Sequence, residues 1–147
     1  MGRVVAIDVG QKRIGIAVTD VLQIIATPLD TLHVKDIWPF LTKYVQAEDI
    51  TQFVVGYPLQ EDGSDSYAMR FAKPFAKKLK KSFPAIPVEM FDERYTSVMA
   101  KEAIKTGGAK KSKRADKGLV DRISAAILLQ MWMNQHEKTV LNKRNNG

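Results

Sequence analysis

Apolar positions follow two kinds of spacing along the chain, and the first of them is typical of β-strands. Residues 3–8 enclose an unbroken apolar run and predict a buried strand. Residues 13–20 predict a second strand, because large apolar residues alternate there with small ones. The link over residues 10–12 is short enough for an antiparallel hairpin. Residues 24–32 predict a third strand, and Pro28 places it at a sheet edge because proline cannot donate a ladder hydrogen bond.

Beyond residue 35 the apolar spacing becomes helical and then alternates between helix and strand. The predicted elements are, in order, a helix capped by Asp36, a parallel strand around residues 53–55, an amphipathic helix within residues 66–83 that Pro74 kinks, a strand within residues 88–94, and helices over residues 97–105 and 117–135. This order predicts an α/β fold with a mixed five-stranded sheet, three antiparallel strands and then parallel ones, flanked by helices. A single domain over residues 1–147 is expected, with a flexible tail over residues 138–147.

Composition narrows the functional classes. The absence of cysteine excludes disulfides, thiolate catalysis and cysteine-based metal sites. No apolar run reaches the ~20 residues that span a bilayer, and the N-terminus enters a strand without a secretory leader. We expect a cytoplasmic protein that does not associate with a membrane.

Charge is unevenly spread. Residues 1–73 hold 7 Lys and Arg against 9 Asp and Glu, whereas residues 74–147 hold 16 against 7. A basic half of this size indicates a polyanionic partner, with nucleic acid first and an acidic membrane surface second. A solvated lysine-rich surface would give the same count.

Three carboxylates stand where a charged side chain is costly. Asp8 ends an apolar strand, Asp92 and Glu93 end another, with Glu93 taken as the candidate, and Asp121 lies one turn into a helix that is apolar nearly all round. If the helix crosses a sheet that contains both strands, the three can converge. Such a cluster repels itself unless cations neutralise it, and oxygen-only ligands suit Mg²⁺ or Mn²⁺. Two such ions support phosphodiester cleavage.

Each acid also has an ordinary explanation. Asp8 could be a turn residue, and Asp92 or Glu93 could pair with Arg94 on the surface. Asp121 is close enough to the helix start for the dipole to favour an acid. Only the joint placement of the three favours a site.

Four blocks, "AIDVGQKRIGIAVTD", "VVGYPLQEDGS", "FDERYTS" and "KGLVDRISAAILLQ", carry a family resemblance. In order and spacing the chain resembles the YqgF/RuvX family of bacterial RNase H-like proteins over residues 3–135, a family named both for Holliday junction resolution and for pre-16S rRNA cleavage. The resemblance implies an RNase H-like fold and a metal-binding catalytic set that matches Asp8, Glu93 and Asp121. Many RNase H-like nucleases carry an acid at the end of the fourth strand, where this chain reads "VVGYP". Glu93 would then substitute for it.

Basic residues flank the proposed site in sequence. Lys12 and Arg13 lie in the hairpin, and Arg94 follows Glu93 directly. The segment "GGAKKSKRADKG" adds the remaining candidates for contact with nucleic acid, Lys110, Lys111, Lys113, Arg114 and Lys117. This segment is expected to be a mobile clamp on the phosphate backbone or, alternatively, a flexible solvated loop.

The leading hypothesis is a metal-dependent endonuclease that acts on structured nucleic acid, with precursor 16S rRNA as substrate. The alternatives are a resolvase of branched DNA, a nucleic-acid-binding protein without catalysis, and a phosphate-binding ATPase lobe suggested by "DVGQKRIGIAVTD". A weak homodimer is compatible with all of them, and a resolvase requires a dimer to cut two symmetric strands.

Overall fold

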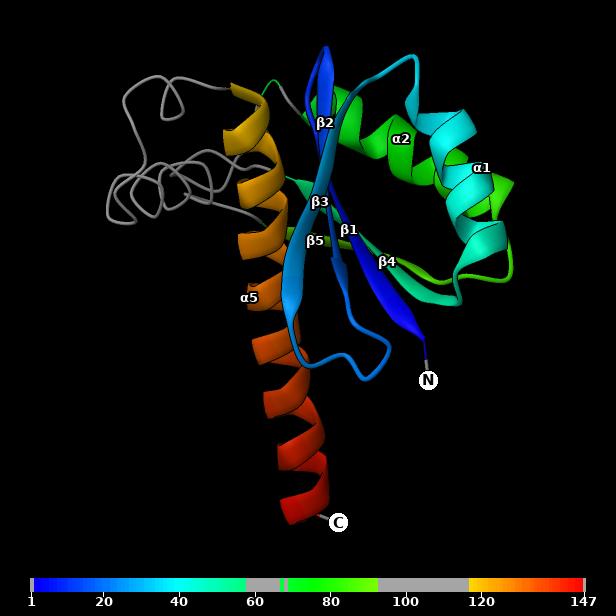
Figure 1. Ribbon diagram of the computed structural model, residues 1–147. Helices are drawn as coiled ribbons and strands as arrows, with labels where there is room; N and C mark the ends of the chain where they lie inside the picture. The colour runs from blue at the N-terminus through cyan, green and yellow to red at the C-terminus, as the bar shows by residue number, and fades with distance from the viewer. Residues whose placement is uncertain (1, 58–66, 68, 93–116, 147) are drawn as a thin grey trace.

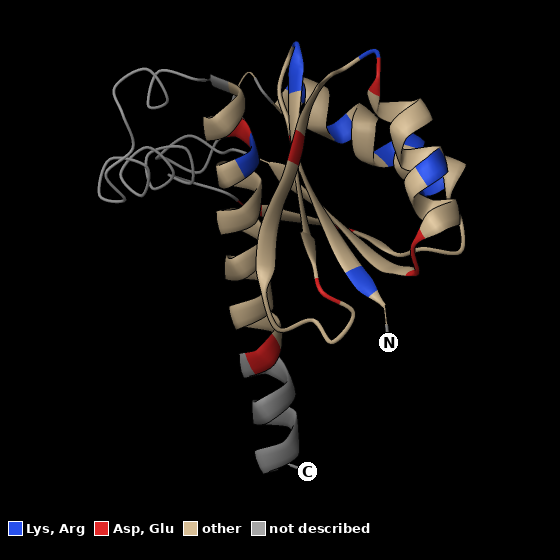
Figure 2. Cartoon of the chain, in the orientation of Figure 1, with Lys and Arg blue, Asp and Glu red and all other residues tan. Residues whose placement is uncertain are grey.

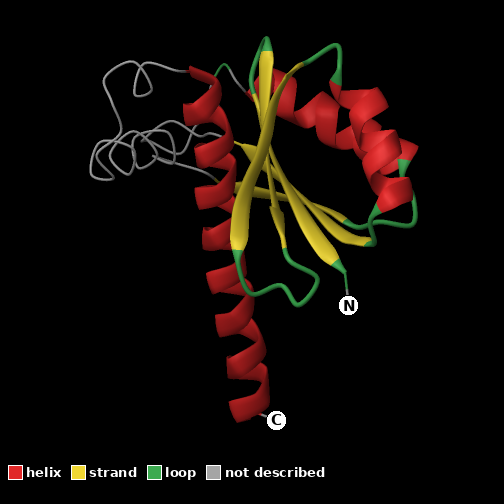
Figure 3. Ribbon diagram, viewed as in Figure 1, coloured by secondary structure: helices red, strands yellow, loops and turns green. Residues whose placement is uncertain are grey.

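The computed structural model describes residues 2–57, 67, 69–92 and 117–146, with Lys117 and residues 138–146 described as backbone only. Its elements are β1 (Arg3–Val9), β2 (Arg13–Thr19), β3 (Ala26–His33), α1 (Ile37–Ala47), β4 (Ile50–Tyr57), α2 (Met69–Ser82), β5 (Val88–Asp92) and α5 (Lys117–Asn146). They form three layers, with α5 on one face of a sheet and α1 and α2 on the other (Figure 1; Figure 3 gives the same view by element type).

The five strands form one sheet in the order β3-β2-β1-β4-β5. β2 pairs antiparallel with β1 and β3, whereas β4 runs parallel to β1 and β5 parallel to β4. This confirms the predicted mixed sheet, the hairpin between the first two strands, the edge position of the strand that contains Pro28 and the central position of the fourth strand. Because β1, β4 and β5 are parallel, their C-terminal ends meet at one edge of the sheet, where open α/β sheets bind ligands.

Each face of the sheet has its own apolar core. α1 and α2 cover large side chains, among them Ile7, Ile16 and Phe53. α5 covers smaller ones, and the members of this second core are Val4, Ala6, Ala17 and Val54 of the sheet with Ala125, Leu128, Leu129 and Trp132 of the helix. Successive residues of a strand point to opposite faces, so one strand such as β1 supplies both cores.

β3 begins at Ala26, two residues later than predicted, because Asp20 organises the preceding loop. Its carboxylate accepts hydrogen bonds from the backbone N–H groups of Leu22 (3.1 Å), Ile24 (2.8 Å) and Ile25 (2.7 Å). The bond from Ile25 contributes most to holding the pKa of Asp20 below its usual value. Amides held by a side chain are not available to a strand ladder, and the strand therefore starts after them.

α5 continues to Asn146, beyond its predicted end at residue 135, and is helical through most of the predicted flexible tail at residues 138–147. Residues 136–146 contain neither Gly nor Pro, so no local signal stops the helix where its apolar pattern fades. Figure 1 shows this part of α5 extending past the sheet.

Two other helix predictions have different outcomes. Asp36 occupies the N-cap position of α1 as predicted, but its side chain makes no capping hydrogen bond. The helix predicted over residues 97–105 lies outside the described residues. No helix in the described part of the chain is long and apolar enough to cross a membrane.

Candidate functional site

Asp8 lies near the C-terminal end of β1, on the face that α5 covers. It pairs with Gly15 of β2 and with Gly56 of β4. Val4 and Ala6 precede it at two-residue spacing, and both belong to the α5 core. The alternation of side chains therefore places Asp8 on the same face, beside two glycines that add no side chain next to it.

Asp121 reaches this part of the sheet because Gly15 lets α5 approach closely. A Cβ atom added at Gly15 would lie 2.1 Å from the backbone oxygen of Asp121, a distance that no real side chain can occupy. Residues directly opposite each other in an antiparallel pair share a face, so Asp8 lies on the same side of the sheet as Gly15. The structure thus brings two of the three predicted acids, Asp8 of β1 and Asp121 of α5, to the same face of the sheet.

Asp92 lies on the opposite face of the sheet from Asp8 and Asp121. It ends β5 opposite Tyr57. Val88 and Met90 of the same strand pack against the α1 and α2 core, so alternation places Asp92 on that face and not with Asp8. Glu93, the third predicted acid, lies outside the described residues.

Arg13 contacts a predicted metal ligand. Its Nε donates a hydrogen bond to Oδ2 of Asp121 at 2.7 Å, across 108 positions of sequence. The side chains are 45% and 25% exposed, so solvent screens the pair and its contribution to stability is at most about 1 kcal/mol. Its consequence is local, because a cation that binds Asp121 must share or replace this guanidinium.

A depression of about 240 Å³ lies between the β1–β2 turn and α5, lined by Gly10, Gln11, Lys12, Arg13 and Asp121. The backbone N–H of Gly10 donates to the carbonyl of Arg13 at 2.9 Å and closes the turn. Lys12 is exposed at the tip. An acid and two cations thus share an open surface beside the strand end that carries Asp8.

The donor chemistry of the site fits a hard divalent cation. Asp8 and Asp121 supply carboxylate oxygens without histidine or cysteine, the ligand type of Mg²⁺ and Mn²⁺. Within the described residues no group of three His, Cys, Asp or Glu side chains is placed to hold a metal ion. Of the three predicted metal ligands, the described residues include two, Asp8 and Asp121.

The side chains of the other residues predicted to contact nucleic acid are not among those that the structure describes. Lys117 begins α5 and is described as backbone only. The remaining five, Arg94, Lys110, Lys111, Lys113 and Arg114, lie outside the described residues.

The sequence profile of one family matches nearly the whole chain, residues 2–135, and its description is RuvX, Holliday junction resolvase. The chain belongs to the RuvX family. A RuvX relative from Phocaeicola vulgatus, named "Putative pre-16S rRNA nuclease", is 49% identical over 133 residues, which cover 90% of this chain and 96% of the relative. A relative of the same name from Porphyromonas gingivalis is 44% identical over 138 residues, 94% of this chain and all of the relative.

Among solved structures, T. thermophilus RuvC in complex with a Holliday junction substrate has a similar fold. Its TM-score is 0.53 at 18% identity, and the match covers 92% of this chain and 96% of that one. The likeness confirms the predicted RNase H-like fold of the RuvX chain.

A second group of candidate residues, not predicted from the sequence, lies on the opposite face of this RuvX chain. Arg70 and Lys78 of α2, with Trp38 of α1, line a pocket there. The available signal was the four-residue spacing of Arg70, Pro74 and Lys78, which puts two cations on one side of α2.

Proposed function

We propose that this chain is a metal-dependent endonuclease that hydrolyses phosphodiester bonds in structured nucleic acid, with 5′-end processing of precursor 16S rRNA as its activity. The observation that carries the proposal is the placement of Asp8 and Asp121 on one face, at the edge where the parallel strands end. The names of relatives at 44–49% identity support the substrate. We expect this activity to take place in the cytoplasm.

In this proposal Asp8, Asp121 and Glu93 hold Mg²⁺ or Mn²⁺. The bound ions would supply an activated water and stabilise the leaving oxygen. Arg13 neutralises Asp121 until a cation takes its place, which limits repulsion between the acids. Lys12 at the turn contacts a backbone phosphate, and Arg94 with the basic residues 110–117 extends that contact. Phosphate contacts of this kind hold the strand without reading its sequence.

Holliday junction resolution is the second candidate, and the description of the matching family favours it. Paired incision of a four-way junction needs two active sites related by symmetry, so this candidate requires a homodimer. Processing of precursor rRNA requires only a single active site, and therefore no dimer.

The first experiment compares cleavage by the wild type with cleavage by Asp8→Asn, which keeps the shape of the side chain and removes its charge. Asp92→Asn is the matched control, because Asp92 is a carboxylate at the end of another parallel strand, β5, on the opposite face. We expect Asp8→Asn to lose at least about 100-fold in rate, since a metal site supplies several kcal/mol of transition-state stabilisation. Asp92→Asn should cleave like the wild type.

The substrates separate the candidates. A 5′-extended 16S rRNA precursor and a four-way DNA junction are incubated in parallel with Mg²⁺ or Mn²⁺. Cleavage of the RNA alone supports the proposal, and symmetric incision of the junction moves the function to DNA. Binding of either substrate without cleavage would leave a non-catalytic nucleic-acid-binding protein.

A further inference from the structure

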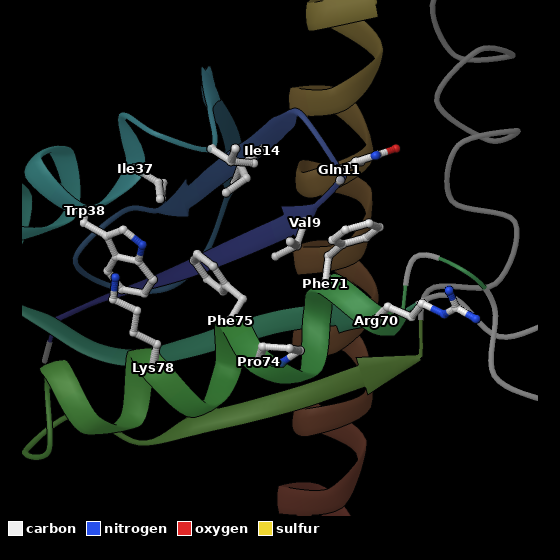
Figure 4. Close-up of a pocket in the computed structure, with 12 residues that line it drawn as sticks. Val9, Gln11, Ile14, Ile37, Trp38, Arg70, Phe71, Pro74, Phe75 and Lys78 are labelled. Atoms are coloured by element: carbon white, nitrogen blue, oxygen red, sulfur yellow. The ribbon is translucent and has the colours of Figure 1, made fainter.

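A pocket of about 360 Å³ lies on the face of the sheet opposite the carboxylates, between the β1–β2 turn and the helices α1 and α2. Its walls are mostly apolar and include three aromatic rings, those of Trp38, Phe71 and Phe75. Figure 4 shows Phe71 and Phe75 rising from α2 toward β1, with Trp38 near one end. Its volume is within the range of sites that hold small organic ligands.

The rim of the pocket is cationic. Arg70 and Lys78 are the charged residues in its lining, and none of the lining residues is acidic. Both side chains are exposed. Lys78 Nζ lies 4.4 Å from the centroid of the Trp38 ring, a cation–π contact that holds a positive charge over the aromatic wall. Figure 2 shows further Lys and Arg positions along the α1 and α2 layer.

The aromatic groups continue along α2. Trp38 stacks on Phe75 with ring centroids 5.0 Å apart, and Tyr67 meets Phe71 edge-on at 5.5 Å. Tyr67 is 59% exposed, and Arg70 lies over its ring. Exposed or partly exposed rings among cations are the usual composition of a surface that binds single-stranded nucleic acid, because rings stack on bases while cations hold phosphates.

The pocket also adjoins the candidate active site. Gly10 and Gln11 line both this pocket and the depression beside Asp121. The two hollows are therefore separated by the width of one turn, a distance that a nucleic-acid strand crosses in a few nucleotides. An apolar ligand without negative charge would place no opposite charge near Arg70 and Lys78.

We propose that this pocket binds one unstacked nucleotide of the nucleic-acid substrate. Its base lies against Trp38 and Phe71, and its phosphate lies against Arg70 or Lys78. The strand then crosses the β1–β2 turn to reach the carboxylates. The proposal rests on the proposed function only for the direction of the strand, since the binding of a nucleotide in the pocket does not require cleavage.

The test measures binding of a short single-stranded RNA to the full-length protein by fluorescence anisotropy, without divalent metal. Phe71→Leu removes the ring and keeps an apolar side chain, and Lys78→Gln removes the charge. Each should weaken binding about tenfold. The matched controls are Phe40→Leu and Lys77→Gln, an aromatic residue and an exposed lysine that lie outside the pocket lining. Equal weakening by variants and controls would overturn the proposal.

A second measurement locates the base. A single abasic position is moved along the RNA, and one position should weaken binding to the wild type about tenfold. At that position Phe71→Leu should cause no further loss, because the ring and the base act as a pair. Additive losses at every position would overturn the pairing.

Trp38 fluorescence distinguishes a strand from a free nucleotide. RNA should quench it, and the quenching should disappear in Trp38→Phe, which leaves Trp132 on the opposite face. A mononucleotide that quenches with the same affinity as RNA would overturn the strand placement. If pocket variants weaken binding while the wild type cleaves nothing, the pocket stands and the nuclease proposal fails. If the pocket variants bind RNA as tightly as the wild type and the wild type cleaves with metal, the nuclease proposal stands and the pocket proposal fails.

Discussion

The two faces of the sheet use the same strands but are covered in different ways. On the α5 face the sheet presents small residues, Gly15, Ala6 and Ala17, and the helix backbone lies directly on the strands. On the other face large side chains such as Phe53 and Ile7 fill the core under α1 and α2, and a pocket remains between these helices and the β1–β2 turn. Small residues thus bring a helix-borne carboxylate to a defined place, whereas large ones leave room for a ligand.

A matched pair of core truncations tests this comparison most strongly. Leu128 of α5 and Leu79 of α2 are both fully buried, one in each core. Leu128→Ala and Leu79→Ala should each lower the free energy of unfolding by about 3 kcal/mol, measured by urea denaturation.

Their effects on activity should differ. α5 carries Asp121, so loosening its packing in Leu128→Ala should reduce cleavage at a temperature where both variants remain folded. At saturating substrate, Leu79→Ala should cleave at nearly the wild-type rate, because α2 contains no carboxylate. Equal cleavage by the two variants would show that the α5 packing does not position the carboxylate.

Gly15→Ala tests the close approach itself. The added Cβ would lie 2.1 Å from a backbone oxygen and 2.4 Å from a backbone carbon of Asp121, and backbone cannot rotate away as a side chain can. We expect a loss of about 2–3 kcal/mol in unfolding free energy, together with loss of cleavage. The control is Ile16→Val on the opposite face, which should cost about 1 kcal/mol and keep activity. Wild-type stability in Gly15→Ala would mean that α5 sits farther from the sheet.

Arg13→Gln should have the smallest effect on stability. The ion pair with Asp121 is half exposed at its Arg13 end, so its loss should change the unfolding free energy by about 0.5 kcal/mol, measured by thermal unfolding. Apparent affinity for Mn²⁺, measured by calorimetry, should rise because no guanidinium then competes for the carboxylate. A large loss of stability with unchanged Mn²⁺ affinity would make Arg13 a structural residue.

The sequence by itself determined the elements that depend on near neighbours. Two-residue alternation specified which side of β2 is small, and the short link specified the hairpin. Pro28 marked the edge strand, because the missing N–H is a property of that one residue. Asp8 and Asp121 were recognisable as costly charges within apolar segments.

Only the tertiary structure decided which of these features meet. That Asp92 lies on the face opposite Asp8 could not be predicted from local sequence, since it depends on which core Val88 and Met90 enter. Arg13 and Asp121 are 108 positions apart, and no local pattern links them.

The pocket is a further case, because it is assembled from a turn and two helices that meet only after folding. Local propensity acts over a few residues, whereas contacts between distant segments are selected by how whole faces pack. That is why the elements could be predicted from the chain, while the partners within the site and the second pocket could not.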